Sequence, residues 1–319
     1  MNCDLLIVGA GPTGLACAIE AGKVGMRAVI VEKGCLVNSI FHYPSNMIFF
    51  TTSELLEIGG VPFATGAPKP SRLEALEYYR KVAVHYGLDV RQYERVNSVK
   101  KKDGGFVVAS ERGQYHAARV VIATGYYDLP NLLGVPGEEL PHVHHYFKEA
   151  HAFAGLNVVV IGGKNFAAET ALDLYRHGAR VTLVHRQAEL GAGIKYWVRP
   201  DILNRIQAKE IAARFQTQVL EILPDGVRVR GPEGEATVAA DFVFPLIGYH
   251  PDFDFLQACG VALGENMRPA CNPATYETNV SGLYLGGVVM AGRNTSEIFI
   301  ENGRFHGKVI VDHIRANQA

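Results

Sequence analysis

Two glycine-rich turns carry the residues with the clearest chemical potential. In the first, Gly9-Ala-Gly11-Pro-Thr-Gly14 follows the apolar run 5–8 and precedes an alanine-rich helical pattern. In a strand–turn–helix unit of this kind, the glycines permit a tight turn, a close approach of pyrophosphate and close packing of the helix on the strand. The helix N-terminus offers N–H groups and a partial positive charge to phosphates. The sequence therefore predicts a dinucleotide site at residues 9–14.

The strand that follows ends in an acid. Residues 27–31 form an apolar run that stops at Glu32, at the usual distance of about 20 positions after such a turn. A carboxylate there accepts hydrogen bonds from a ribose diol and repels a 2′-phosphate. This copy of the pattern favours FAD.

A second copy of the pattern occurs at residues 158–186. An apolar run leads into Gly162-Gly163-Lys164-Asn165-Phe166-Ala167, and the next strand ends at His185-Arg186. His185 follows Gly162 at the same spacing as Glu32 follows Gly9. A guanidinium can bind a 2′-phosphate bidentately, so this copy favours NADPH. The alternative for Arg186 is a surface side chain at a strand end. Lys195 and Arg199 either assist the phosphate or belong to a solvated face.

Bulk properties describe an ordinary soluble chain. The 319 residues suffice for two domains, and 48% are apolar and 20% charged. The net charge of −1 does not point to nucleic acid or an anionic membrane as a partner. No apolar run is long enough to span a bilayer and no signal peptide is recognisable, so we expect a cytoplasmic location. The five scattered cysteines form no CxxC pair or zinc-like spacing and are expected to be reduced, mostly structural thiols.

Periodicity indicates the elements between the turns. We expect a loop at 33–50, which either borders a flavin or packs on its own core, a helix at 70–86 and a β-meander at 88–124. A second small sheet is expected within 219–238, a strand ending near Gly248, and a closing helix from residue 297 whose N-terminus could face a flavin. His306 on that helix is expected to lie on its surface rather than to donate a proton.

These features together resemble the two-domain flavoproteins of the thioredoxin reductase type. More specific strings, VIGGKN at 160–165, HYFKEAH at 145–151, IKYWVRPD at 194–201 and IFIENGRFHG at 298–307, resemble the bacillithiol disulfide reductase family. Lys164 stands where most relatives have a third glycine. The resemblance implies an α/β fold of two Rossmann-like, three-layer (ββα) domains. Residues 1–125 and 247–319 would form the FAD-binding domain and 126–246 the NADPH-binding domain.

The turns and the resemblance together give the expected cofactor contacts. For FAD these are Gly9, Gly11, Pro12, Thr13, Gly14, Glu32, Lys33, Ala123, Thr124, Gly125, Gly287, Val288 and Ile298. For NADPH they are Gly162, Gly163, Lys164, Asn165, Phe166, Ala167, His185, Arg186, Lys195 and Gly248.

Three departures from the related families concern the redox chemistry. The CxxC pair of thioredoxin reductases is missing, as expected of the narrower family, and Val288 follows Gly287 where they have an aspartate. The better-known members of the narrower family carry a cysteine, proposed as the reactive thiol, at the position of Thr13. A threonine hydroxyl cannot perform thiol–disulfide exchange. Cys17 is the nearest cysteine, and its favoured interpretation is a small buried residue on a packed helix.

The predicted function is an NADPH-dependent FAD oxidoreductase that passes electrons to a low-molecular-weight disulfide, such as bacillithiol disulfide, or another acceptor. The resemblance implies a homo-oligomer. One alternative is a ferredoxin- or flavodoxin-NADP reductase, although such enzymes often extend beyond the last helix; another is a redox-sensing flavoprotein that acts through a partner. The histidines at 142, 144, 145 and 151 leave a metal site conceivable, but none is predicted. No nucleophile elbow indicates a hydrolase.

Overall fold

A computed structural model describes residues 2–317 and divides the chain into two compact units. Unit 1 comprises Met1–Leu129 and Tyr249–Ala319, and unit 2 comprises Pro130–Gly248. The chain thus leaves unit 1 once and returns to it once, and these limits lie a few residues from the expected domain boundaries. The short strands β7 (Leu129–Pro130) and β15 (Tyr249–His250) lie at the two crossings.

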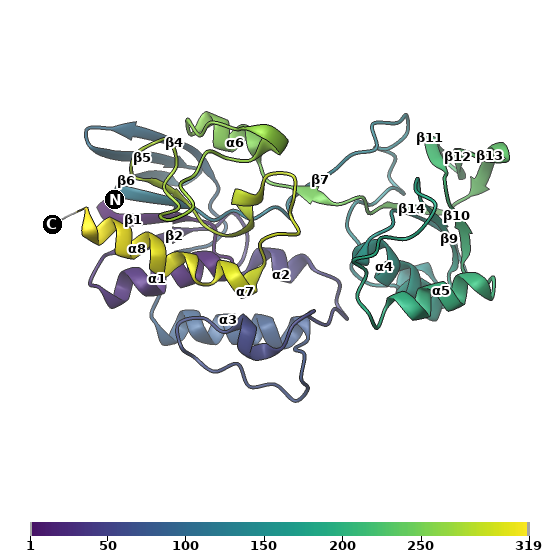
Figure 1. Cartoon of the computed structure of the whole chain (residues 1–319), viewed down its shortest axis with the longest axis horizontal. Helices are drawn as coiled ribbons and strands as arrows, with labels where there is room; N and C mark the ends of the chain where they lie inside the picture. The colour runs from purple at the N-terminus through teal and green to yellow at the C-terminus, as the bar shows by residue number, and fades with distance from the viewer. Residues whose placement is uncertain (1, 318–319) are drawn as a thin grey trace. The chain divides into compact units, whose positions relative to one another are not determined.

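Unit 1 is built on a seven-stranded sheet of order β3-β2-β1-β6-β5-β4, with β16 also paired to β6 (Figure 1). The long strand β6 serves both parts of this sheet: its first half pairs antiparallel with β5 and its second half parallel with β16, while β1 runs parallel along its other edge. The strands are β1 (Asn2–Val8), β2 (Ala28–Val31), β3 (Val90–Arg91), β4 (Val96–Lys102), β5 (Gly105–Ser110), β6 (Gly113–Ile122) and β16 (Leu283–Leu285).

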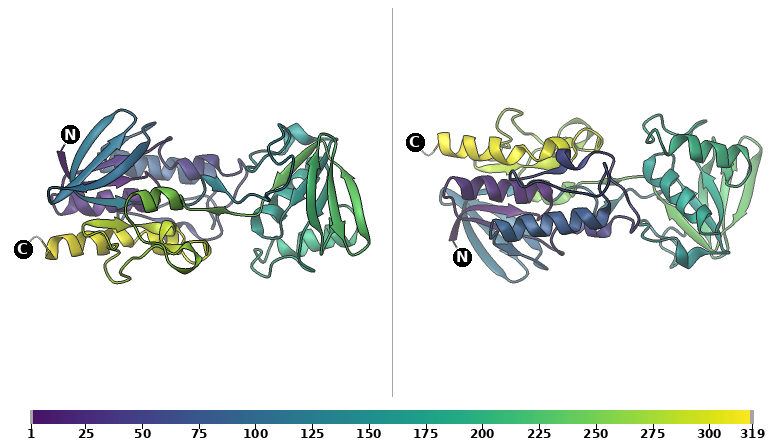
Figure 2. Two further views of the ribbon diagram at one scale, coloured as in Figure 1. Left: turned by 90° about the horizontal axis from the view of Figure 1, so that it is seen from above. Right: turned by 90° about the horizontal axis from the view of Figure 1, so that it is seen from below.

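Alternate residues of β1 face opposite layers. Leu5 and Ile7 pack with helices α1, α3 and α8, whereas Leu6 and Val8 pack with helix α6 and the meander. Because a continuous apolar run has both faces buried, the strand must lie inside a three-layer structure. Figure 1 shows α1, α3 and α8 on one side of the sheet and α6 on the other, and α8 runs alongside α1 in Figure 2.

The helices of unit 1 confirm one expectation and correct two. The helix expected at 70–86 is α3, which begins with a capping box between Ser71 and Glu74. The stretch expected to be a loop contains α2, and the expected closing helix is two helices, α7 and α8. The helical elements are α1 (Pro12–Lys23), α2 (Asn38–His42), η1 (Ser53–Leu56), α3 (Arg72–His85), α6 (Phe253–Ala258), η3 (Glu265–Met267), η4 (Gly287–Ala291), α7 (Ile300–Gly303) and α8 (His306–Ala316).

Unit 2 has the same layering on a parallel sheet of order β10-β9-β8-β14. Val158 and Val160 pack with α4 and α5, while Val159 and Ile161 pack with the antiparallel sheet β11-β12-β13 that was expected at 219–238. Its elements are η2 (His151–Phe153), β8 (Asn157–Ile161), α4 (Asn165–Arg176), β9 (Arg180–Val184), α5 (Arg199–Gln207), β10 (Ala212–Arg214), β11 (Gln218–Leu223), β12 (Gly226–Gly231), β13 (Gly234–Ala239) and β14 (Phe242–Pro245). The predicted internal repeat is therefore present as β1-α1-β2 and β8-α4-β9.

Candidate functional site

The three glycines of the first turn have different surroundings. Gly9 has φ +109°, which favours glycine, and a Cβ there would lie 2.5 Å from the Ala123 carbonyl oxygen. A Cβ on Gly14 would lie 2.0 Å from the Gly9 carbonyl oxygen, whereas one on Gly11 would meet no protein atom within 4 Å. The first and third glycines are thus required by close packing. The second leaves an open approach to the backbone.

The strand end Ala123-Thr124-Gly125 lies directly against this turn. The Ala123 N–H donates to the Val8 carbonyl at 2.8 Å, and its own carbonyl faces Gly9. Helix α1 begins beside it, with Gly11 as its N-cap, Pro12 in its first turn and no side-chain cap. The start of α1 therefore keeps donor capacity that an N-capping side chain would otherwise use.

Glu32 is buried at the end of β2, with only 7% of its surface exposed. Its carboxylate accepts one hydrogen bond from the Ala10 N–H and one from the Gly34 N–H, both at 2.8 Å. Burial raises the pKa of this carboxyl and the two hydrogen bonds oppose the rise. The two N–H groups fix the carboxylate against the first turn and leave further lone pairs for a ligand.

Thr13 lies among three glycines at the start of α1. Cβ atoms built on Gly287 and Gly303 would each lie 3.0 Å from the Thr13 Oγ1, and one on Gly286 would lie 3.2 Å from its methyl group. We call these three glycines the Thr13 cradle. The cradle fits a small side chain.

His306 was expected on the helix surface, and this expectation was wrong. It is 6% exposed, its Nδ1 accepts a hydrogen bond from the Gly287 N–H at 3.0 Å, and its ring packs on Tyr276. Burial lowers its pKa to about 4, so the ring is neutral at pH 7 and Nδ1 is an acceptor. The break between α7 and α8 places the residue inward, which a continuous helix would not have indicated.

The second turn repeats the close approaches of the first. Gly162 has φ +150°, and a Cβ there would lie 2.5 Å from the Leu246 carbonyl oxygen and 2.8 Å from the Ala167 Cβ. A Cβ on Gly163 would lie 2.3–2.5 Å from ring atoms of His185, so the imidazole lies over the turn. Lys164 is the exposed N-cap residue of α4, which also has no side-chain cap.

A tied loop, residues 190–195, covers the second turn. The Gly191 N–H donates to the Gly163 carbonyl at 2.7 Å, and Asn165 accepts from the Lys195 N–H at 2.7 Å and donates to the Gly193 carbonyl at 3.0 Å. Arg199 donates to the Leu190 and Gly191 carbonyls. Sequence reasoning missed the loop-binding roles of Asn165 and Arg199, because these contacts link residues far apart in the chain.

The cations of unit 2 differ in their surroundings. Lys195 is 8% exposed and its ammonium lies 2.5 Å from Glu169, so its charge is already compensated. Arg186 is exposed and forms no hydrogen bond or ion pair with residues 2–317. Burial and the Arg186 charge lower the pKa of His185, which keeps the imidazole neutral. Of the three cations considered for the phosphate, Lys195 pairs with Glu169 and Arg199 with loop carbonyls, so Arg186 has the charge most available to a ligand.

The remaining residues predicted to contact a cofactor lie in ordinary surroundings. Lys33 forms a 2.8 Å ion pair with Asp128, and Val288, Ile298 and Phe166 are partly buried. The Gly248 carbonyl accepts from the Asn131 N–H at 2.9 Å, at the end of unit 2.

All five cysteines are free thiols, as expected. Cys17 is fully buried, and burial raises its pKa to about 12. A Cβ on Gly307 of α8 would lie 2.7 Å from the Cys17 Cα, so helix backbone covers this residue. Its structural interpretation fits these surroundings.

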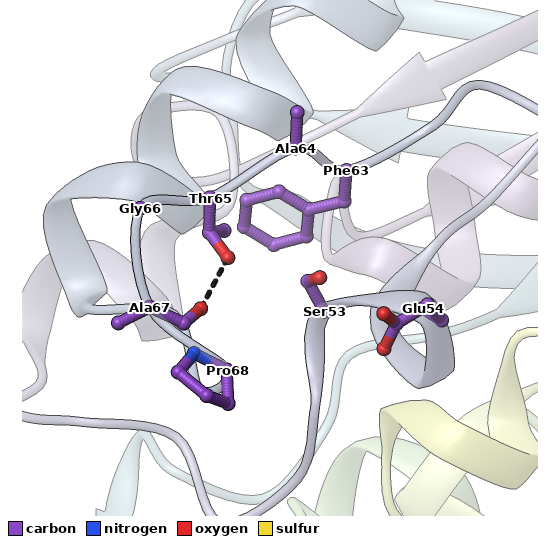
Figure 3. A pocket seen from close by; sticks show the side chains of 8 residues that line it. All are labelled: Ser53, Glu54, Phe63, Ala64, Thr65, Gly66, Ala67 and Pro68. Carbon is purple, nitrogen blue, oxygen red and sulfur yellow. Dashed lines mark hydrogen bonds between the residues drawn. The ribbon is translucent and has the colours of Figure 1, made fainter.

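Two further features lie outside the turns. A pocket of about 420 Å³ in unit 1 is lined by Ser53, Glu54 and residues 63–68, and Thr65 within it donates to the Ala67 carbonyl (Figure 3).

Residues 2–317 contain no cluster of three or more His, Cys, Asp or Glu side chains arranged for a metal. His142 instead lies 3.1 Å from the Leu223 carbonyl, and His145 lies 3.8 Å from Glu138. In the same part of the chain, no helix is long and apolar enough to cross a membrane.

The residues present fit two dinucleotides. The first turn combines an open backbone at Gly11, an uncapped helix start and a buried carboxylate, Glu32. The second combines an uncapped helix start with the exposed cations Lys164 and Arg186. An acid suits a ribose diol and a guanidinium suits a 2′-phosphate.

Comparisons with known proteins agree with this fold. The family model of pyridine nucleotide-disulphide oxidoreductases matches residues 6–287. The chain is 46% identical over 312 residues to the bacilliredoxin reductase Bdr of Bacillus subtilis (strain 168), covering 97% of this chain and 96% of that protein. The solved bacillithiol disulfide reductase Bdr from Staphylococcus aureus has a TM-score of 0.97 at 40% identity, with full coverage of both chains. A ferredoxin–NADP reductase of Ignicoccus hospitalis is 27% identical over 98% of each chain.

The matches confirm the expected α/β fold of the thioredoxin reductase type and the narrower resemblance. The chain is an NAD(P)H-dependent flavin oxidoreductase and belongs, within the pyridine nucleotide-disulphide oxidoreductases, to the bacillithiol disulfide reductase family.

Proposed function

We propose that this chain uses NADPH to reduce a low-molecular-weight disulfide such as bacillithiol disulfide, with FAD at the first turn and NADPH at the second. The observation that carries the proposal is the charge difference between the two turns: buried Glu32 follows the first, and exposed Arg186 follows the second. The disulfide acceptor is favoured by the 46% identity with a bacilliredoxin reductase over nearly the whole chain.

Each unit contributes binding and orientation. In unit 1, the α1 start and the open backbone at Gly11 would receive the FAD pyrophosphate, and Glu32 would accept from the adenosine ribose. In unit 2, the α4 start would receive the NADPH pyrophosphate, with Lys164 beside it and Arg186 at the 2′-phosphate. The flavin supplies the chemistry of accepting hydride from a nicotinamide and passing electrons to the acceptor.

The neutral imidazole of His306 accepts a hydrogen bond from one backbone N–H group of unit 1. By accepting from the Gly287 N–H, it fixes the start of η4 beside Thr13. Protonation would remove this acceptor, because both nitrogens of an imidazolium are donors. The low pKa of about 4 keeps the contact intact through the physiological pH range.

Two other functions remain as alternatives. A ferredoxin- or flavodoxin-NADP reductase is favoured by the whole-length similarity to the Ignicoccus enzyme, at the lower identity of 27%. A redox-sensing flavoprotein would show slow turnover with every acceptor and an NADPH-dependent complex with a partner. We also propose, from the resemblance, a homo-oligomer in the cytoplasm.

Anaerobic stopped-flow tests the proposal in two mixing steps. The purified yellow protein is first mixed with NADPH and then with bacillithiol disulfide, while flavin absorbance is followed. Fast bleaching followed by fast recovery is expected. Bleaching without recovery would contradict the disulfide acceptor and direct the search to ferredoxin or flavodoxin, and failure to bleach would contradict the enzymatic proposal.

A further inference from the structure

All five cysteines lie in unit 1, and none is bonded to another. Three of them, Cys3, Cys17 and Cys259, are buried. A thiol relay requires a thiolate that an incoming disulfide can reach in line with the bond it breaks. The five cysteines of this chain differ in how far they meet each requirement.

Cys17 fails on access. It is one helical turn from Thr13 on α1, its side chain is fully buried, and the backbone of α8 at Gly307 covers its Cα and N atoms. Its pKa of about 12 leaves almost no thiolate at pH 7. An acceptor disulfide could reach its sulfur only after α1 and α8 had separated.

The two partly exposed cysteines, Cys35 and Cys271, fail on activation. Cys35 follows Glu32 closely, and burial together with that carboxylate raises its pKa. Its sulfur lies 3.6 Å from Asn38 Oδ1, an oxygen that also accepts from the Cys35 N–H. Cys271 contacts the Met290 sulfur, and burial raises its pKa to about 11. The Arg72 charge opposes the rise at Cys35 only as the smallest contribution, and no charged group lowers the pKa of Cys271.

The residue best placed for activation is not a thiol. Thr13 lies in the first turn of α1, where a thiolate would be stabilised by the helix N-terminus. Cβ atoms on Gly287 and Gly303 would come within 3.0 Å of its hydroxyl oxygen, so the Thr13 cradle is filled by the side chain that is present. A hydroxyl in this place cannot open a disulfide.

We propose that this chain reduces its disulfide acceptor without forming a bond between the acceptor and any sulfur of its own. The inference rests on the proposed function. In the overall reaction NADPH loses a hydride to become NADP⁺ and the acceptor S–S bond breaks. Its two sulfurs gain two electrons and two protons, one of them from solvent. All five cysteines stay reduced thiols throughout, and no mixed disulfide forms on the protein.

Intact-mass analysis of the full, flavin-loaded protein tests this directly. The protein is mixed anaerobically with bacillithiol disulfide, with and without NADPH, and quenched in acid while NADPH consumption is followed in parallel. We expect NADPH consumption with no added mass. The Cys35→Ser/Cys271→Ser double variant should turn over at the wild-type rate, within about twofold.

A Thr13→Cys variant is the positive control for trapping. The cradle accommodates a side chain of this size, so the new thiol should react with an alkylating reagent at least tenfold faster than any native cysteine. It should also gain the mass of one bacillithiol on exposure to the disulfide. If this variant loses its flavin, the alkylation rates of the native cysteines in the flavin-loaded wild type are compared with that of a free thiol, and no native cysteine should react faster.

The outcomes separate the inference from the proposed function. Turnover without an adduct supports both. Turnover with an adduct on a native cysteine, lost together with activity when that cysteine becomes serine, would overturn the inference alone. Flavin bleaching by NADPH with no further NADPH consumption when the disulfide is present would reject the proposed acceptor, and the inference with it.

Discussion

The two glycine turns share a backbone plan but differ in what surrounds it. Both place a glycine with positive φ against a neighbouring carbonyl, Ala123 in one unit and Leu246 in the other. The strand after the first turn ends at a buried acid held by two N–H groups, whereas the strand after the second ends at the exposed Arg186, and a loop is tied over the second turn. The two units thus share a backbone geometry, and the side chains at the strand ends distinguish them.

The largest expected effect is a difference in stability between alanine variants at two glycines of the first turn. Gly14→Ala puts a methyl group 2.0 Å from the Gly9 carbonyl oxygen, which should cost about 3 kcal/mol or more of the free energy of unfolding, because backbone must move. Gly11→Ala meets no protein atom and should keep the stability of the apoprotein but lose FAD. Denaturant unfolding and flavin content of both variants measure this, and equal destabilisation would contradict the assigned roles.

The next effect is a pH dependence specific to the first unit. The pKa of His306 is lowered to about 4 from an ordinary 6.5, so the unfolded chain takes up this proton first as pH falls. The contribution of neutral His306 is therefore complete above pH 6.5 and is lost as pH falls toward 4, by on the order of 3 kcal/mol. Thermal unfolding of wild type and His306→Asn against pH should show a steeper acid loss in the wild type, and parallel curves would contradict it.

Arg186→Ala tests whether the side chain at the end of the second strand sets the preference for NADPH over NADH. Loss of a charge-assisted contact worth about 1.5–3 kcal/mol should raise the NADPH KM roughly 10- to 150-fold. The NADH KM should change little, because NADH has no 2′-phosphate. Lys164→Ala is the matched control and should weaken both coenzymes alike. Equal effects of Arg186→Ala on both coenzymes would remove the 2′-phosphate role.

Asn165→Ala should have the smallest effect of the four. It removes two hydrogen bonds that hold the 190–195 loop over the second turn, each worth about 1 kcal/mol. The KM values for NADPH and NADH should rise together by several-fold, with FAD content unchanged. A selective loss of NADPH would assign Asn165 to the phosphate instead of to the loop.

Local patterns predicted much of the fold. The apolar runs before each turn, the matched spacing to Glu32 and His185, and the Ser71 start of α3 are local signals, and the elements that they predict are present in the structure. The three-layer arrangement is also predictable from the sequence, because runs such as residues 5–8 are apolar on both faces of the strand.

Contacts between distant residues were not predictable in the same way. The inward position of His306 depends on a break between α7 and α8, and its partner Gly287 is on another element. The pairing of Lys195 with Glu169 and the loop ties of Asn165 and Arg199 join separate segments. No local periodicity encodes such pairs, so sequence alone left open whether Lys195 and Arg199 assist the phosphate or belong to a solvated face.

We propose that unit 1 binds the flavin and that NADPH bound to unit 2 reduces it in preference to NADH. An anaerobic titration of the purified yellow protein, followed by flavin absorbance, tests it most directly. We expect full bleaching with about one NADPH per bound flavin, and a much higher NADH concentration for the same effect. Equal bleaching by both coenzymes, or none with NADPH, would contradict it.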